Sequence, residues 1–144
     1  LVLLSPAVPE VAVGVTAPRR LNLPVLPEPG RGIRTAWDLS WTRLEDERDA
    51  GGHCLAFRWS GPVHGQGNDG GEDWAARYRV SGTASGDTCL GAADFHPVRG
   101  SLSWEVSMDV LFAESAGDGS YVPRGTLRQQ HAWTGRIART GGAP

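Results

Sequence analysis

Residues 101–112 read SLSWEVSMDVLF, and this stretch carries the clearest structural pattern in the chain. Apolar and polar residues alternate strictly along it. Side chains of a β-strand point alternately to the two faces of a sheet, so a period of two predicts a strand with one apolar and one solvated face. The apolar positions are Leu102, Trp104, Val106, Met108, Val110 and Phe112.

The same alternation recurs on both sides of this stretch. It predicts further strands at residues 33–42, 53–59, 74–80 and 88–95, and a last pair at residues 121–133 and 136–139. Turns are predicted where charged or small residues gather, at residues 45–52, 85–87 and 117–120, with a glycine-rich loop at residues 61–71.

The first 32 residues are expected to be extended rather than helical, because proline fixes φ and lacks the amide hydrogen that a helix requires. An alternating piece at residues 9–16 predicts a short first strand, and the rest of the segment is expected to run along the body of the fold. The prolines of this segment are Pro6, Pro9, Pro18, Pro24, Pro27 and Pro29.

These elements predict an all-β protein. A chain of 144 residues with 40% hydrophobic and 21% charged residues fits one domain, residues 1–144, with residues 1–32 as a proline-rich cap and first strand. Strands separated by turns every 8–12 residues or so are typical of a sandwich or a barrel. We expect a single eight-stranded antiparallel β-barrel, because eight strands enclose an interior that holds side chains or one small ligand.

Charge and composition argue against several classes of partner. The net charge is −2 and the fourteen arginines are scattered, so nucleic acid is not an expected partner. The longest apolar stretches are only a few residues, so a membrane is not an expected partner either. Residues 1–4, LVLL, lack a basic segment and are followed by Ser5-Pro6, which is a poor secretory signal, and we expect a cytoplasmic location. Cys54 and Cys89 form either one bridge or two buried thiols, and we favour the thiols.

Motifs for cofactors and metals are weak. Residues 65–70 match G-x-G-x-x-G, but an alternating segment follows them where a dinucleotide site needs a helix. The four histidines lack the spacings that place two ligands on one face, so neither a metal nor a cofactor is expected. His53 and Cys54 point to opposite faces of a strand and cannot form a nucleophile–base pair.

The tryptophans are the candidates for lining the interior of the fold. Six tryptophans lie on alternating faces, and they either fill a core or line a cavity for an apolar or conjugated ligand. The six are Trp37, Trp41, Trp59, Trp74, Trp104 and Trp133.

A few polar residues share the phase of these tryptophans. Tyr78 is in phase with Trp74, and Gln129 and His131 are in phase with Trp133. Each is either a hydrogen-bonded core group or a donor aimed at a ligand carbonyl. Glu10 is either a solvated carboxylate or the partner of an arginine such as Arg128.

Several short stretches, in their order and approximate spacing, resemble one family: the small β-barrel [4+2] cyclases (Diels-Alderases) of spirotetronate and spirotetramate polyketide biosynthesis. The most specific stretch is GAADF at residues 91–95. The others are LL at 3–4, VPEV at 8–11, WD at 37–38, FR at 57–58, VR at 98–99, SW at 103–104, GSY at 119–121, RQ at 128–129 and TG at 134–135.

This resemblance implies an eight-stranded antiparallel barrel, paired as a homodimer, with the reaction in its lumen. The family tyrosine that hydrogen-bonds the tetronate carbonyl then corresponds to Tyr78. Trp37 and Phe95 correspond to aromatic wall residues, and Glu10 to the cap glutamate.

The last strand departs from the family pattern. The family's inward arginine, aromatic residue and methionine fall on Gln129, His131 and Trp133, and Arg128 is one place out of phase. Either the cap salt bridge shifts its register, or a hydrogen bond from Gln129 to Glu10 replaces it.

We therefore expect a cofactor-independent cyclase that performs an intramolecular [4+2] cycloaddition of a linear, hydrophobic polyene. Tyr78, His131 and Gln129 are the expected catalytic residues, and Glu10 and Arg128 the cap. The alternative is a non-catalytic, lipocalin-like or dirigent-like barrel that binds a hydrophobic small molecule. The expected substrate-binding residues are Trp37, Trp41, Trp74, Phe95, Trp104, Met108 and Trp133.

Overall fold

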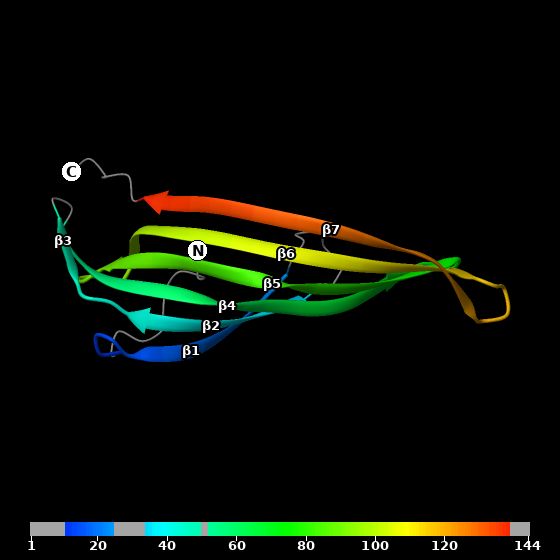
Figure 1. Ribbon diagram of the computed structural model, residues 1–144, viewed down its shortest axis with the longest axis horizontal. Coiled ribbons are helices and arrows are strands. Elements are labelled where there is room, and N and C mark those ends of the chain that lie inside the picture. The colour runs from blue at the N-terminus through cyan, green and yellow to red at the C-terminus, as the bar shows by residue number, and fades with distance from the viewer. Residues whose placement is uncertain (1–10, 25–33, 50–51, 139–144) are drawn as a thin grey trace.

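A computed structural model describes residues 11–24, 34–49 and 52–138, and the strands in these ranges form one antiparallel sheet (Figure 1). The sheet order is β1-β2-β4-β5-β6-β7, with the short β3 paired to β4. The strands are β1 (Thr16–Pro24), β2 (Arg34–Arg43), β3 (Glu47–Asp49), β4 (Gly52–Gly70), β5 (Trp74–Gly91), β6 (Pro97–Ser115) and β7 (Tyr121–Ala138).

The all-β antiparallel class is confirmed, with seven strands in the described residues. Neighbours in the sheet follow the order of the chain, and β1 and β7 lie at its two edges. Within the described ranges, no pairing of β1 with β7 closes the sheet into a barrel. The same ranges contain no helix with the length and hydropathy needed to cross a membrane.

The strands are longer than the sequence pattern indicated. The predicted loop at residues 61–71 lies almost wholly in β4, the predicted turn at 85–87 lies in the middle of β5, and the predicted pair at 121–133 and 136–139 is the single strand β7. Glycine and serine suggest turns when read alone. Here the neighbouring strands pair with these segments residue by residue, so their backbone groups are satisfied as strand.

The observed strands also begin and end at other residues than the predicted ones. The predicted strand at residues 9–16 is not seen at residues 11–15, and β1 begins at Thr16; residues 1–10 lie outside the described ranges. The strand predicted at 88–95 ends at Gly91. The turn predicted at residues 117–120 is confirmed: the Ala116 amide donates to the Ser120 carbonyl, and Gly117 and Gly119 have φ of 84° and 87°.

One face of the sheet holds the core, and we call it the aromatic face. It consists of the odd-numbered residues of β1, β2, β4 and β7 and the even-numbered residues of β5 and β6, which the register places opposite one another. At its centre the Trp41 and Trp59 rings stack with centroids 5.8 Å apart, and Phe57 meets Trp41 edge-on. One buried cluster runs from β2 to β6.

Gly86 leaves the space that Trp59 occupies. Gly86 lies directly opposite Trp59 in the register, and a Cβ added at Gly86 would overlap the indole ring and the Ser101 carbonyl. The small residue is therefore required here by close approach, because Trp59 is only 2% exposed and has little room to move.

Gly86→Ala is expected to lower the melting temperature by about 3–10 °C, the effect of overpacking a core of this size. Gly125→Ala is the matched control, because nothing lies within 4 Å of a Cβ at that position of β7. Thermal unfolding followed by circular dichroism measures both. Equal melting temperatures for the two variants would show that Trp59 does not lie over Gly86.

Cys54 and Cys89 form a disulfide on the opposite, outer face, so the expectation of two buried thiols is wrong. The register sets Ala56 against Cys89 and Cys54 against Gly91. The two cysteines are thus diagonal neighbours on one face, and their Cα atoms lie 5.5 Å apart, within the range for a bridge. Sequence spacing alone does not show this pairing. A small cluster with Ala56, Leu44 and Val98 surrounds the bridge.

Removal of the bridge is expected to lower the free energy of unfolding by about 3–4 kcal/mol, since it closes a loop between residues separated by 35 positions. Urea unfolding with and without dithiothreitol measures the effect. The double variant Cys54→Ala, Cys89→Ala should unfold at the same urea concentration in both conditions. Two thiols alkylated in the untreated native protein would contradict the bridge.

Candidate functional site

The expected site residues gather on the half of the aromatic face formed by β5, β6 and β7. Three cross-strand rows define this half: Tyr78–Val110–Leu127, Val80–Met108–Gln129 and Gly82–Val106–His131. A fourth row, Ala84–Trp104–Trp133, borders it. The face therefore presents an apolar strip along β6 with polar groups on both sides.

Tyr78 and the Gln129–His131 pair lie on opposite sides of this strip. With strands about 4.8 Å apart and about 3.3 Å per residue, the Cα atoms of Tyr78 and Gln129 are separated by roughly 10 Å across the sheet and 7 Å along it. Tyr78 is half-buried, and its hydroxyl has no hydrogen-bond partner among the described residues. A ligand of polyene size can therefore contact both sides at once.

His131 and Gln129 are hydrogen-bonded to each other. The imidazole Nε2 and the carboxamide Oε1 lie 3.4 Å apart, and both side chains are exposed. With Oε1 as acceptor, the proton is on Nε2. Gln129 therefore fixes the direction in which His131 donates.

The six tryptophans divide into two groups by the exposure of their side chains. Trp37, Trp41 and Trp59 are at most 9% exposed and fill the core. Trp104 is half-buried, whereas Trp74 and Trp133 are 38% and 47% exposed. Only the second group is available to a ligand at the surface of the aromatic face.

The indole N–H groups of the three buried tryptophans differ in their hydrogen bonding. Trp37 donates to Thr35 Oγ1 at 3.0 Å, and Trp59 donates to Thr88 Oγ1 at 3.3 Å. Trp41 Nε1 is buried and has no hydrogen-bond partner among the described residues. These threonines lie on the aromatic face, and their partners could not be assigned without the register.

The remaining expected residues lie elsewhere. Met108 is 8% exposed and forms part of the strip floor. Phe95 lies in the turn between β5 and β6 with φ of 54°, outside the rows. Arg128 lies on the outer face, where its guanidinium donates to Asp109 at 2.6 and 3.2 Å. Glu10 lies outside the described residues.

The outer face carries an ion cluster that the sequence pattern does not predict. Arg20 donates to Asp38 at 2.5 and 3.0 Å, and His64 Nε2 lies 2.7 Å from the same carboxylate. The hydrogen bonds from Arg20 and then His64 hold the pKa of Asp38 far below its usual value. The register of β1, β2 and β4 brings the three together, so the sequence alone carried no signal for it.

Asp38→Asn is expected to lower the melting temperature at pH 7 by less than about 4 °C, because exposed ion pairs contribute little. A depressed folded-state pKa stabilises the protein above the unfolded pKa of about 4 and loses this effect as the pH falls further. The difference from wild type should therefore shrink below about pH 4.

The exposed turn variant Asp73→Asn serves as the control for this series. Melting curves from pH 2 to 7 test the prediction. A difference for Asp38→Asn that stays constant over the whole range would contradict the coupling.

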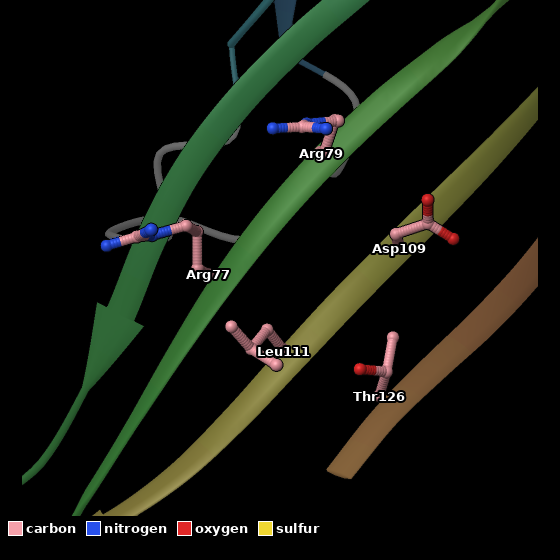
Figure 2. A pocket seen from close by; sticks show the side chains of 5 residues that line it. All are labelled: Arg77, Arg79, Asp109, Leu111 and Thr126. Carbon is pink, nitrogen blue, oxygen red and sulfur yellow. The ribbon is translucent and has the colours of Figure 1, made fainter. Parts of the chain in front are cut away.

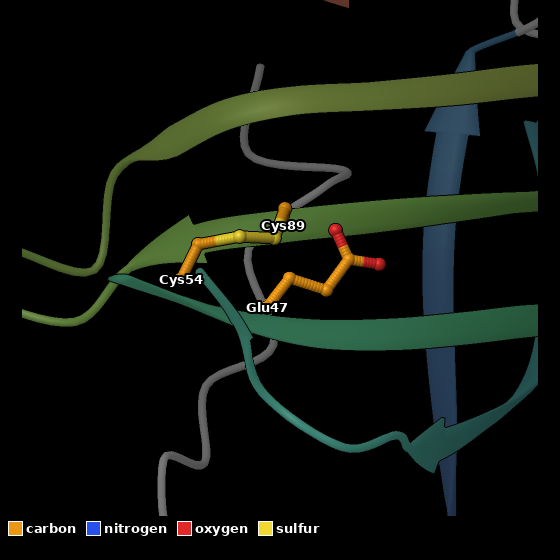
Figure 3. A group of neighbouring side chains, drawn as sticks. All are labelled: Glu47, Cys54 and Cys89. Carbon is orange, nitrogen blue, oxygen red and sulfur yellow. A yellow bond between two sulfur atoms is a disulfide. The ribbon is translucent and has the colours of Figure 1, made fainter. Parts of the chain in front are cut away.

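A group that could hold a metal lies at the disulfide. Glu47, Cys54 and Cys89 bring one ligand atom each within 4.8 Å of one another (Figure 3). Metal ligation by cysteine requires the thiolate, and here both sulfur atoms are joined in the bridge. Glu47 is also ion-paired with Arg99. The donor set of the bridged protein therefore does not fit a metal.

The G-x-G-x-x-G segment at residues 65–70 is likewise unsuited to phosphate. It forms the end of β4 and is paired with β5 along its length, so its amides do not open a helix.

A scan against models of known protein families found no match to this chain, and searches of curated proteins and of solved structures found none either.

Proposed function

We propose that the chain is a cofactor-independent cyclase that performs an intramolecular [4+2] cycloaddition of a linear polyene on the aromatic face. The observation that carries the proposal is the apolar strip of β6. On one side of it lies the Tyr78 hydroxyl, which has no hydrogen-bond partner among the described residues, and on the other lies the Gln129–His131 pair. Sites for small hydrophobic molecules have this composition, in which few polar groups orient a ligand on an apolar wall.

The reaction places modest demands on the protein. A diene and a dienophile within one chain form two new σ bonds and one new π bond at the expense of three π bonds, and the product is an isomer of the substrate. No proton or electron leaves the molecule. Much of the barrier is the entropy of folding the flexible polyene, and a surface that imposes the reactive conformer supplies several kcal/mol.

Tyr78 is the proposed donor to the carbonyl conjugated with the dienophile. Its hydroxyl has no hydrogen bond to break among the described residues, whereas His131 Nε2 already faces Gln129. A hydrogen bond that strengthens as electron density moves onto the carbonyl oxygen lowers the barrier by about 2–4 kcal/mol in a dry site. His131 and Gln129 then orient the far end of the substrate.

Closure of the sheet belongs to the same proposal. Six strands lie along the path from β1 to β7, and consecutive strands are antiparallel, so the two edges run in opposite directions and are suited to antiparallel pairing. Leu127 and Trp133 on β7 are 45% and 47% exposed. A closed barrel would cover this apolar surface and enclose the substrate, as would the homodimer that the family resemblance implies.

A cytoplasmic location remains a prediction, and the Cys54–Cys89 disulfide is an argument against it. Bridges are rare in the cytosol, where thiol reductants act on them. Cys54 and Cys89 are 7% and 3% exposed, which limits access by a reductant.

Tyr78→Phe is expected to slow product formation by about 30- to 1000-fold while changing the KM by less than about threefold. The assay incubates a linear polyene bearing a tetronate or tetramate group with the protein and detects an isomeric product by chromatography with mass detection. Tyr121→Phe is the matched control, because Tyr121 is the other tyrosine of the chain and lies exposed at the start of β7.

An unchanged rate in Tyr78→Phe would remove this residue from the chemistry. Quenched tryptophan fluorescence without an isomeric product would favour the non-catalytic binding barrel instead.

A further inference from the structure

A pocket of about 270 Å³ lies on the outer face, on the side of the sheet opposite the aromatic face (Figure 2). Its lining comes from three neighbouring strands: Arg77 and Arg79 from β5, Asp109 and Leu111 from β6, and Thr126 from β7. None of these residues belongs to the site proposed above, and none was a candidate from the sequence.

The two arginines of the pocket make no hydrogen bond within the part of the chain that the structure describes. Neither Arg77 nor Arg79 has an ion-pair or hydrogen-bond partner among the described residues, and both are exposed. Their side chains extend from β5 toward β4 (Figure 2), where the register sets Asn68 opposite Arg77 and Gln66 opposite Arg79. Two cations two residues apart on one strand face, flanked by carboxamides, present many hydrogen-bond donors.

The single acid in the lining is already neutralised. Asp109 accepts two hydrogen bonds from Arg128, and these bonds, with a weaker contribution from Arg79, lower the pKa of its carboxyl. The local charge is therefore positive, although the whole chain carries −2. An anion on the β4 side of the pocket meets two guanidinium groups that have no hydrogen-bond partner among the described residues, while the Asp109 carboxylate is compensated by Arg128.

The pocket also has an apolar part. Leu111 is 41% exposed and lies between Arg77 on β5 and Thr126 on β7 in the register. An exposed leucine beside the aliphatic stems of two arginines offers a contact for a hydrocarbon chain. The lining thus combines a cationic end with an apolar end.

We propose that this pocket binds an oxyanion carried on a short aliphatic chain, with Arg77 and Arg79 holding the anionic group and Leu111 contacting the chain. Carboxylates and phosphate esters share this chemistry, because arginine pairs with both through two parallel hydrogen bonds. The site is independent of the cyclase proposal, since the two lie on opposite faces of the sheet.

Titration of the ¹⁵N-labelled protein with octanoate, monitored through its backbone amides, tests the site. We expect saturable shifts at residues 77–79 and 109–111, weakened by 500 mM salt. The double variant Arg77→Gln, Arg79→Gln should weaken binding by at least about tenfold, since each lost charged hydrogen bond is worth a factor of that order. Arg136→Gln is the matched control. Arg136 lies on β7, on the outer face of the sheet like Arg77 and Arg79, and it is exposed with no ion-pair partner in the described part of the chain.

Three further probes separate the contributions. Acetate should bind more weakly than octanoate if Leu111 contacts the chain, and tighter binding of octyl phosphate than of octanoate would identify a phosphate ester as the preferred class. Neutral octanamide should leave these amides unshifted. The proposal is overturned if octanamide shifts them equally, if octanoate shifts only residues of the aromatic face, or if the double variant binds as the wild type does.

Discussion

The continuous pairing of β4, β5 and β6 is the constraint on which the other features depend. Because side chains alternate along a strand, a slip of one residue in this register would move every side chain of a strand to the other face. The same register sets Trp59 over Gly86, joins Cys54 to Cys89 on the outer face and lines Tyr78 up with Val110. The packing of the core, the disulfide and the arrangement of the candidate site thus all follow from this one strand register.

Periodicity was enough to predict the fold class and the composition of each face. The alternation at residues 101–112 correctly separates Met108 from Asp109, and the same phase placed Tyr78, Gln129 and His131 on the aromatic face. Strand length was not predictable, because the glycines of β4 and β5 suggest turns until a partner strand is known. The disulfide and the Asp38 cluster depend on which residues lie opposite each other across strands, information that a single sequence does not contain.

Burial on the aromatic face changes along the width of the sheet. On β2 and β4 the tryptophans are buried and give the sheet its stability, whereas on β7 every side chain that the structure describes, apart from Gly135, is exposed. The buried and the exposed parts of this surface therefore belong to different strands. Substitutions of exposed side chains on β7 are expected to cost little stability, so under the proposed function this strand can vary most freely.

The outer edge of β7 also affects how the protein behaves at high concentration. A strand of 18 residues at the edge of a sheet has backbone groups that can pair with another chain. Arg124, Arg128 and Arg136 are spread along β7, and Pro123 removes one amide hydrogen near its start. Pro123 cannot donate a hydrogen bond to such a partner, and charged side chains along an edge strand disfavour pairing with another chain.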